Sequence, residues 1–106
     1  MSEATALERL KLEKKKIEKQ VEMLKPQKTI IETKLSAVIK EEEKLTKELR
    51  ACRDEYKYNR LDMRLNTVSR SRREIKSQNE EIERKLRGLN EDIDKLGRKI
   101  KYLKPR

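Results

Sequence analysis

The chain has 106 residues, of which 47% are charged and only 33% are hydrophobic, and its formal net charge is +10. Globular domains usually contain about 45–50% apolar and about 25% charged residues, so this composition excludes a thick core and favours a coiled coil or long helices, with disorder as the alternative. The positive charge favours acidic partners, because the summed field attracts polyanions, although a solvated helix face would have the same composition.

Apolar residues spaced alternately by three and four positions predict a first helix over about residues 5–52. This spacing is typical of a coiled-coil seam. Pro26 lies outside the seam and predicts a kink, because proline removes one helical hydrogen bond; alternatively, residues 1–25 form a separate arm. The predicted seam of this first arm consists of Leu10, Ile17, Leu24, Ile31, Leu35, Val38, Leu45 and Leu49. Further seam positions of the same spacing are occupied by Lys14, Val21 and Glu42.

A second apolar stripe begins at Leu61, two residues out of phase with the first. Two residues correspond to about 200° of helix rotation, so a continuous helix would bury opposite faces before and after residue 60. A turn over about residues 53–60 removes this conflict, with Asn59 as the expected N-cap of the second helix. We expect Tyr56 and Tyr58 to cover the end of the core, the alternative being that they stack on nucleic-acid bases.

The second arm is predicted over about residues 61–104. Its seam consists of Leu61, Leu65, Val68, Ile75, Ile82, Leu86, Leu89, Ile93, Leu96, Ile100 and Leu103. An antiparallel register in which paired residue numbers sum to 110 aligns both ends of the seams. It also places Glu42 and Arg72, a polar seam position of the second arm, in adjacent layers, and it brings Glu48 near Arg64. The predicted fold is therefore all-α, a single antiparallel two-helix coiled-coil hairpin over residues 1–106, which could associate further into homo-oligomers.

Basic residues gather in two places. In the hairpin, the two ends of the chain come together and form the terminal cluster, and the turn and its flank form the turn cluster. The terminal cluster consists of Lys11, Lys15, Lys16, Lys19, Lys95, Arg98, Lys99, Lys101, Lys104 and Arg106. The turn cluster consists of Arg53, Lys57, Arg60, Arg64, Arg70 and Arg73. Both are candidate interaction sites for acidic proteins or nucleic acid; lysines at a helix C-terminus also favour the helix dipole.

The stretch Asn66–Arg73 precedes apolar residues at strict intervals of seven, and Asn79 lies at a seam position. This part resembles a basic leucine zipper, which implies helices in the DNA major groove. The resemblance covers less than half of the chain. It departs from the family pattern at Glu74, where the family has arginine.

Residues for catalysis or metal binding are scarce, because the chain has no His and only one Cys. We therefore expect no enzyme activity, metal or cofactor. We expect Cys52 to be a small apolar residue buried in the seam. The apolar runs are too short to span a membrane, no targeting signal is evident, and the lone cysteine indicates a reducing, intracellular compartment. The expected function is a non-enzymatic structural or adaptor subunit of a larger assembly, which docks through its basic ends onto an acidic protein or nucleic-acid surface. Direct DNA or RNA binding of low sequence specificity is the alternative.

Overall fold

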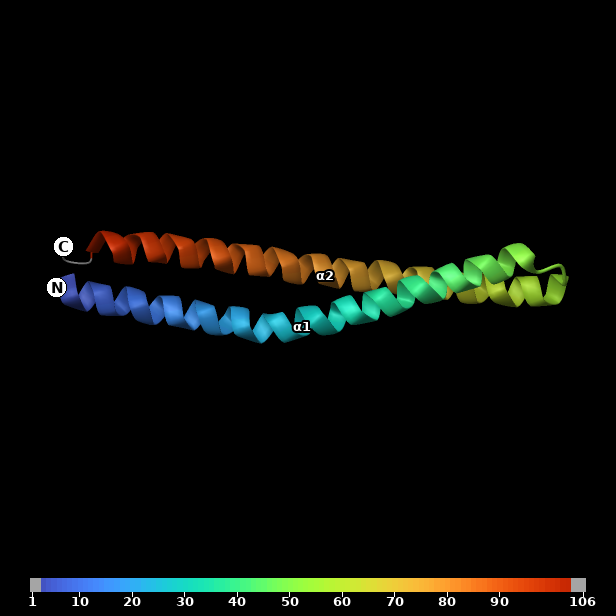
Figure 1. The fold of residues 1–106 in the computed structure, drawn as a ribbon, viewed down its shortest axis with the longest axis horizontal. Helices are drawn as coiled ribbons and strands as arrows, with labels where there is room; N and C mark the ends of the chain where they lie inside the picture. The colour runs from blue at the N-terminus through green and yellow to red at the C-terminus, as the bar shows by residue number, and fades with distance from the viewer. Residues whose placement is uncertain (1–2, 104–106) are drawn as a thin grey trace. The chain divides into compact units, whose positions relative to one another are not determined.

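The computed structural model describes residues 3–103, which form two long helices, α1 (Glu3–Ala51) and α2 (Glu55–Leu103), joined by a short connection (Figure 1). Strands are absent from these residues. The predicted all-α helical hairpin is confirmed at this level. α1 continues past Pro26 to Ala51, and the kink stays a prediction.

The connection consists of Cys52, Arg53 and Asp54. The backbone N–H of Cys52 donates to the carbonyl of Leu49 at 3.3 Å, which closes the last turn of α1. Asp54 Oδ1 then accepts hydrogen bonds from the backbone N–H groups of Tyr56 at 3.0 Å and Lys57 at 3.4 Å. These groups have no partner within the helix, so Asp54 is the N-cap of α2.

The turn is therefore shorter than the predicted range of 53–60, and the prediction of Asn59 as the cap is wrong. Asn59 lies inside α2, four residues after its start. No described residue has a positive backbone φ angle. The turn therefore does not need glycine, the residue that adopts this conformation most readily.

The chain divides into two compact units. Unit 1 contains Met1–Lys28 and Ile82–Arg106, and unit 2 contains Thr29–Glu81. Within each unit a part of α1 packs against a part of α2 that runs in the opposite direction. The described residues before Thr29 thus belong to the same unit as the C-terminal part of α2, and a separate arm over residues 1–25 stays an open alternative.

Burial follows the spacing of three and four residues along both helices. Each described seam position is buried or half-buried, whereas most other positions are exposed. The most buried side chains keep 4–9% of their surface exposed, and they are Val21, Leu45, Val68, Ile82, Leu96 and Ile100. Two packed helices cover only one side of each seam residue, so none of the described side chains is completely buried.

Ion pairs link the helices within each unit. In unit 1, Lys28 Nζ lies 3.9 Å from Glu83 Oε1. In unit 2, Arg72 Nε lies 2.8 Å from Glu42 Oε2, which confirms the predicted pair. Arg64 instead pairs with Glu41, at 3.3 Å, and not with the predicted Glu48. The predicted register pairs residues whose numbers sum to 110. In each of these three ion pairs, the partner lies within about one and a half helical turns of the residue that this register predicts.

Candidate interaction surfaces at the two basic clusters

All six members of the turn cluster lie in unit 2 and are exposed. Arg53 lies in the connection and the other five follow along α2. Lys57, Arg60 and Arg64 lie close to one another, because they line one shallow hollow of about 520 Å³ together with Glu48 and Leu61. The structure thus brings three of the six predicted cations to one face and places Arg70 and Arg73 further along the helix.

Tyr56 does not cover the core, contrary to the prediction. Its side chain is 71% exposed, and Tyr58 is 44% exposed. The guanidinium carbon of Arg60 lies 5.8 Å from the centroid of the Tyr56 ring, one helical turn away, which is a cation–π geometry. Met63, one turn further on, is also exposed. The start of α2 therefore presents aromatic, sulfur and guanidinium groups to solvent.

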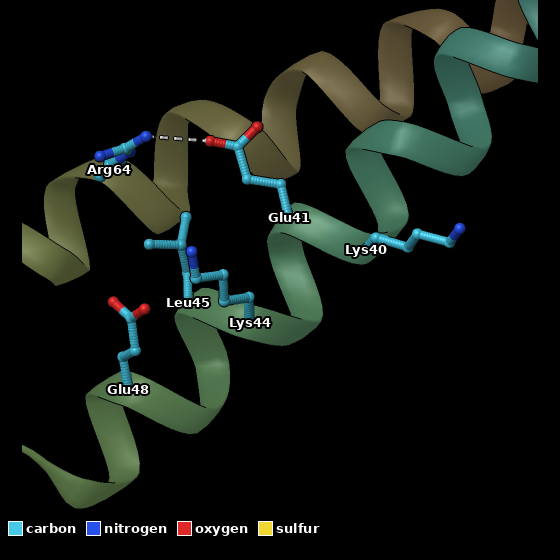
Figure 2. Close-up of a pocket in the computed structure, with 6 residues that line it drawn as sticks. All are labelled: Lys40, Glu41, Lys44, Leu45, Glu48 and Arg64. Atoms are coloured by element: carbon cyan, nitrogen blue, oxygen red, sulfur yellow. Dashed lines mark hydrogen bonds and ion pairs between the residues drawn. The ribbon is translucent and has the colours of Figure 1, made fainter.

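Part of the positive charge near the turn is neutralised by a carboxylate of the other helix. Figure 2 shows Glu41 of α1 and Arg64 of α2 reaching toward each other over a hollow that Leu45 also lines. The same hollow is lined by Lys40, Lys44 and Glu48, so both signs of charge alternate around it. Arg64 is consequently engaged in holding the two helices together, although two thirds of its side chain remains exposed.

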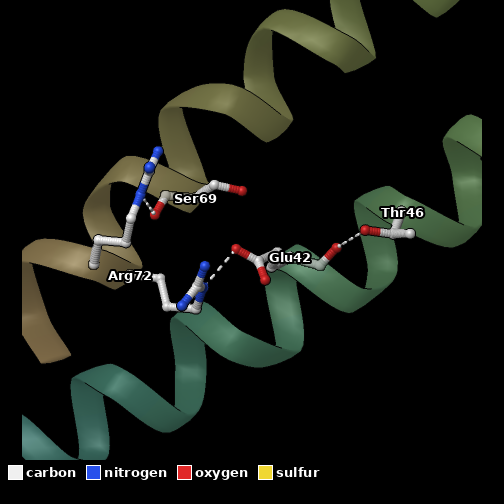
Figure 3. A network of polar contacts seen from close by, with 5 residues as sticks. Glu42, Thr46, Ser69 and Arg72 are labelled. Atoms are coloured by element: carbon white, nitrogen blue, oxygen red, sulfur yellow. Dashed lines mark hydrogen bonds and ion pairs between the residues drawn. The ribbon is translucent and has the colours of Figure 1, made fainter.

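A second polar contact lies within the seam itself (Figure 3). The side chains of Glu42 and Arg72 are only 25% and 30% exposed, and their 2.8 Å contact is charge-assisted. The hydroxyl of Thr46 donates to the backbone carbonyl of Glu42 at 2.8 Å. The hydrogen bond from Arg72 lowers the pKa of Glu42 below its ordinary value of 4.5, a hydrogen bond from Ser69 and the charge of Arg73 lower it further, and desolvation opposes them.

The terminal cluster lies in unit 1, where eight of its ten members are described and all eight are exposed. Lys104 and Arg106 lie outside the described residues. Within residues 3–103 the structure shows no ion pair for these eight cations. The terminal cluster therefore differs from the turn cluster, where Arg64 is paired.

Two hollows lie beside the terminal cluster. One, of about 400 Å³, is lined by Leu10 of α1 and by Arg98, Lys99, Tyr102 and Leu103 of α2. The other lies beside the seam residue Lys14 and is lined by Ile93, Asp94, Gly97, Arg98 and Lys101. In the second hollow, Lys14 of α1 lies near Arg98 and Lys101 of α2, whereas the members of the terminal cluster that belong to α1 line neither hollow. Sequence reasoning did not single out Tyr102, which is 90% exposed; its place next to the seam residue Leu103 was the available signal.

The net charge is distributed unevenly between the units. The sequence of unit 1 contains 17 Lys and Arg and 9 Asp and Glu, which gives +8, whereas unit 2 contains 13 and 11, which gives +2. Almost all of the excess positive charge therefore belongs to unit 1. A polyanion is attracted by this summed charge more than by any single lysine.

Other kinds of site find little support in residues 3–103. No group of three or more potential metal ligands occurs there. Cys52 is half-buried, and its thiol lies 3.4 Å from the carbonyl oxygen of Asp54. Neither α1 nor α2 contains, in its described part, an apolar window of the length needed to cross a bilayer. Comparison of the chain with protein-family models, curated proteins and solved structures gives no match.

Proposed function

We propose that the chain is a non-enzymatic coiled-coil adaptor, a structural subunit that docks onto an acidic protein surface through the terminal cluster. The observation that carries this proposal is the concentration of charge: unit 1 has a net charge of +8, and all eight described members of the terminal cluster are exposed. Cations that are not used inside the hairpin are available to a partner. The lone, half-buried Cys52 supports a reducing, intracellular location.

The half-buried seam supports the coiled-coil part of the proposal. Apolar side chains at alternating intervals of three and four residues are the pattern that antiparallel coiled coils bury. A pair of helices alone covers this seam incompletely, so a subunit of this kind gains stability when a larger assembly covers the rest.

Direct binding of DNA or RNA is the second candidate. The observation that favours it is the exposed ring of Tyr102 beside Lys99 and Lys101, because single-stranded nucleic acid binds to surfaces that combine aromatic rings with cations. The same charge attracts both kinds of polyanion, so the two functions must be separated by experiment.

A pull-down with and without nuclease separates them. We expect proteins captured by the full chain to remain bound after nuclease treatment and to be lost from the variant K15E/K99E/K101E. The matched control is K34E/K40E/K47E, which changes the net charge by the same amount at exposed positions of unit 2 outside both clusters. Loss of the captured proteins on nuclease treatment would favour direct nucleic-acid binding, and equal capture by both variants would contradict a role for the terminal cluster.

A further inference from the structure

The seam of unit 1 is only partly covered by its own two helices. Four of its described side chains are buried, namely Val21, Ile82, Leu96 and Ile100. The other described seam residues of this unit are half-buried, including Leu10 and Leu103. Apolar surface that remains exposed along a groove between two helices can be covered by a third helix.

We define the terminal groove by the five residues that line it: Leu10, Arg98, Lys99, Tyr102 and Leu103. Leu10 comes from α1 and the other four from α2, so the groove lies between the helices. The two leucines and the ring of Tyr102 supply its apolar surface, and Arg98 and Lys99 supply its charge. Tyrosine and arginine are among the residues that contribute most to binding energy at protein interfaces.

The charge around the groove selects its occupant. No acidic residue lines it, and the adjacent hollow beside Lys14 contributes Lys101 and a single carboxylate, Asp94. A second copy of this chain would bring another unit of net charge +8 against the first, which is unfavourable. A helix that carries carboxylates beside its apolar stripe matches both the leucines and the cations.

We propose that the terminal groove binds an acidic amphipathic α-helix of a partner protein. The apolar stripe of that helix packs on Leu10, Tyr102 and Leu103. Its flanking carboxylates pair with Arg98 and Lys99. This inference rests on the proposed function, because it names the part of an acidic partner that the terminal cluster recognises.

Fluorescence anisotropy with labelled synthetic peptides tests the inference on the full chain. The first peptide has three heptads, about 21 residues, with Leu at every a and d position and Glu or Ala elsewhere. The second has the same composition with the leucines dispersed around the helix. We expect the first peptide to bind about tenfold more tightly than the second, because only its leucines can reach the groove together.

The variant Y102A should weaken binding of the first peptide about tenfold and leave binding of the second nearly unchanged. Tyr102 is 90% exposed, so its removal should leave the helical circular dichroism signal intact. The matched control is Y56A, which removes another exposed tyrosine, but in unit 2. A second variant, K99E, should weaken binding of both peptides.

The outcomes separate this inference from the proposed function. Equal binding of the two peptides, or binding of the first that is insensitive to Y102A, would overturn the groove as the site and leave docking on acidic surfaces standing. Failure of both peptides to bind would contradict both. If neither peptide binds but an oligothymidylate of about 20 nucleotides binds in a Tyr102-dependent manner, a single-stranded nucleic acid occupies the surface and the inference is wrong.

Discussion

In unit 2, Arg72 and Arg64 of α2 pair with Glu42 and Glu41 of α1 at 2.8 Å and 3.3 Å. In unit 1, the described cations of the terminal cluster are exposed, and the structure shows no ion pair for them within residues 3–103. Both units have the same kind of apolar seam. Unit 2 packs its two helices in the same way with a net charge of only +2. The comparison teaches that the excess positive charge of unit 1 is not needed for the packing of its helices.

The largest effect should come from the seam that both units share. L45A in unit 2 and L96A in unit 1 each truncate a buried leucine, and each should lower the free energy of unfolding by about 2–3 kcal/mol. The exposed Leu12 provides a control, since L12A should change it by less than about 0.5 kcal/mol. Urea unfolding followed by circular dichroism measures all three. A loss confined to one unit's leucine would show that the two units do not depend equally on their seams.

The second effect concerns the charge of unit 1. The variant K15E/K99E/K101E should weaken binding to polyglutamate on the order of a hundredfold at low salt, because it changes the local charge by six. K34E/K40E/K47E makes the same change in unit 2 and should have a clearly smaller effect. Titration calorimetry at two salt concentrations measures both affinities. Equal losses of affinity in the two variants would contradict the difference between the units, because binding would then depend on the total charge and not on its location.

The third effect lies at the turn in unit 2. D54A removes the side chain that caps α2 and should lower the free energy of unfolding by about 1 kcal/mol. N59A should be neutral or slightly stabilising, because Asn59 lies inside α2, where alanine is the better helix former. Thermal unfolding of the two variants distinguishes the observed cap from the one that the sequence suggested. A larger loss for N59A would contradict the structure of the turn.

The smallest effect should come from the seam ion pair of unit 2. E42Q should lower the free energy of unfolding at pH 7 by about 0.5–1 kcal/mol, whereas E41Q, whose pair with Arg64 is more exposed, should cost less. The folded-state pKa of Glu42 is lowered, so its contribution is fully present above the ordinary value of 4.5 and is lost as the pH falls through the lower folded value. Thermal unfolding from pH 7 to pH 2 should show that E42Q and the parent chain converge in acid. Divergence there would mean that the carboxylate is not the stabilising form.

The two-helix architecture could be predicted because it depends on periodicity. Alternating steps of three and four residues place side chains on one face of any helix, and the phase shift between Cys52 and Leu61 left a turn as the simplest solution. The ion pair between Glu42 and Arg72 could be predicted for the same reason, since both residues lie at seam positions in adjacent layers.

The details of the turn could not be derived in this way. Asp54 and Asn59 are both good N-caps, and the choice between them depends on where α1 ends, which periodicity does not set. The error at Tyr56 has the same origin. Counted with the first stripe it is a seam residue, but once α2 begins at Glu55 its position is set by Leu61, five residues later, which places it away from the seam. The terminal groove could not be predicted from the sequence, because it combines half-buried seam residues with exposed neighbours, and these come from the start of α1 and the end of α2.

The hollow beside Lys14 is also lined by Gly97, which lies inside α2, as does Gly88. A methyl group added at either glycine would meet nothing within 4 Å, so no close approach of another element requires glycine there. Each glycine destabilises a helix interior by about 1 kcal/mol relative to alanine. The stretch of α2 from residue 88 to 97 should therefore open locally more often than the neighbouring interior turns of the helix, and its amide protons should exchange with deuterium before theirs. This stretch lies next to the terminal groove, so the proposed docking of a third helix should slow the exchange of these amide protons.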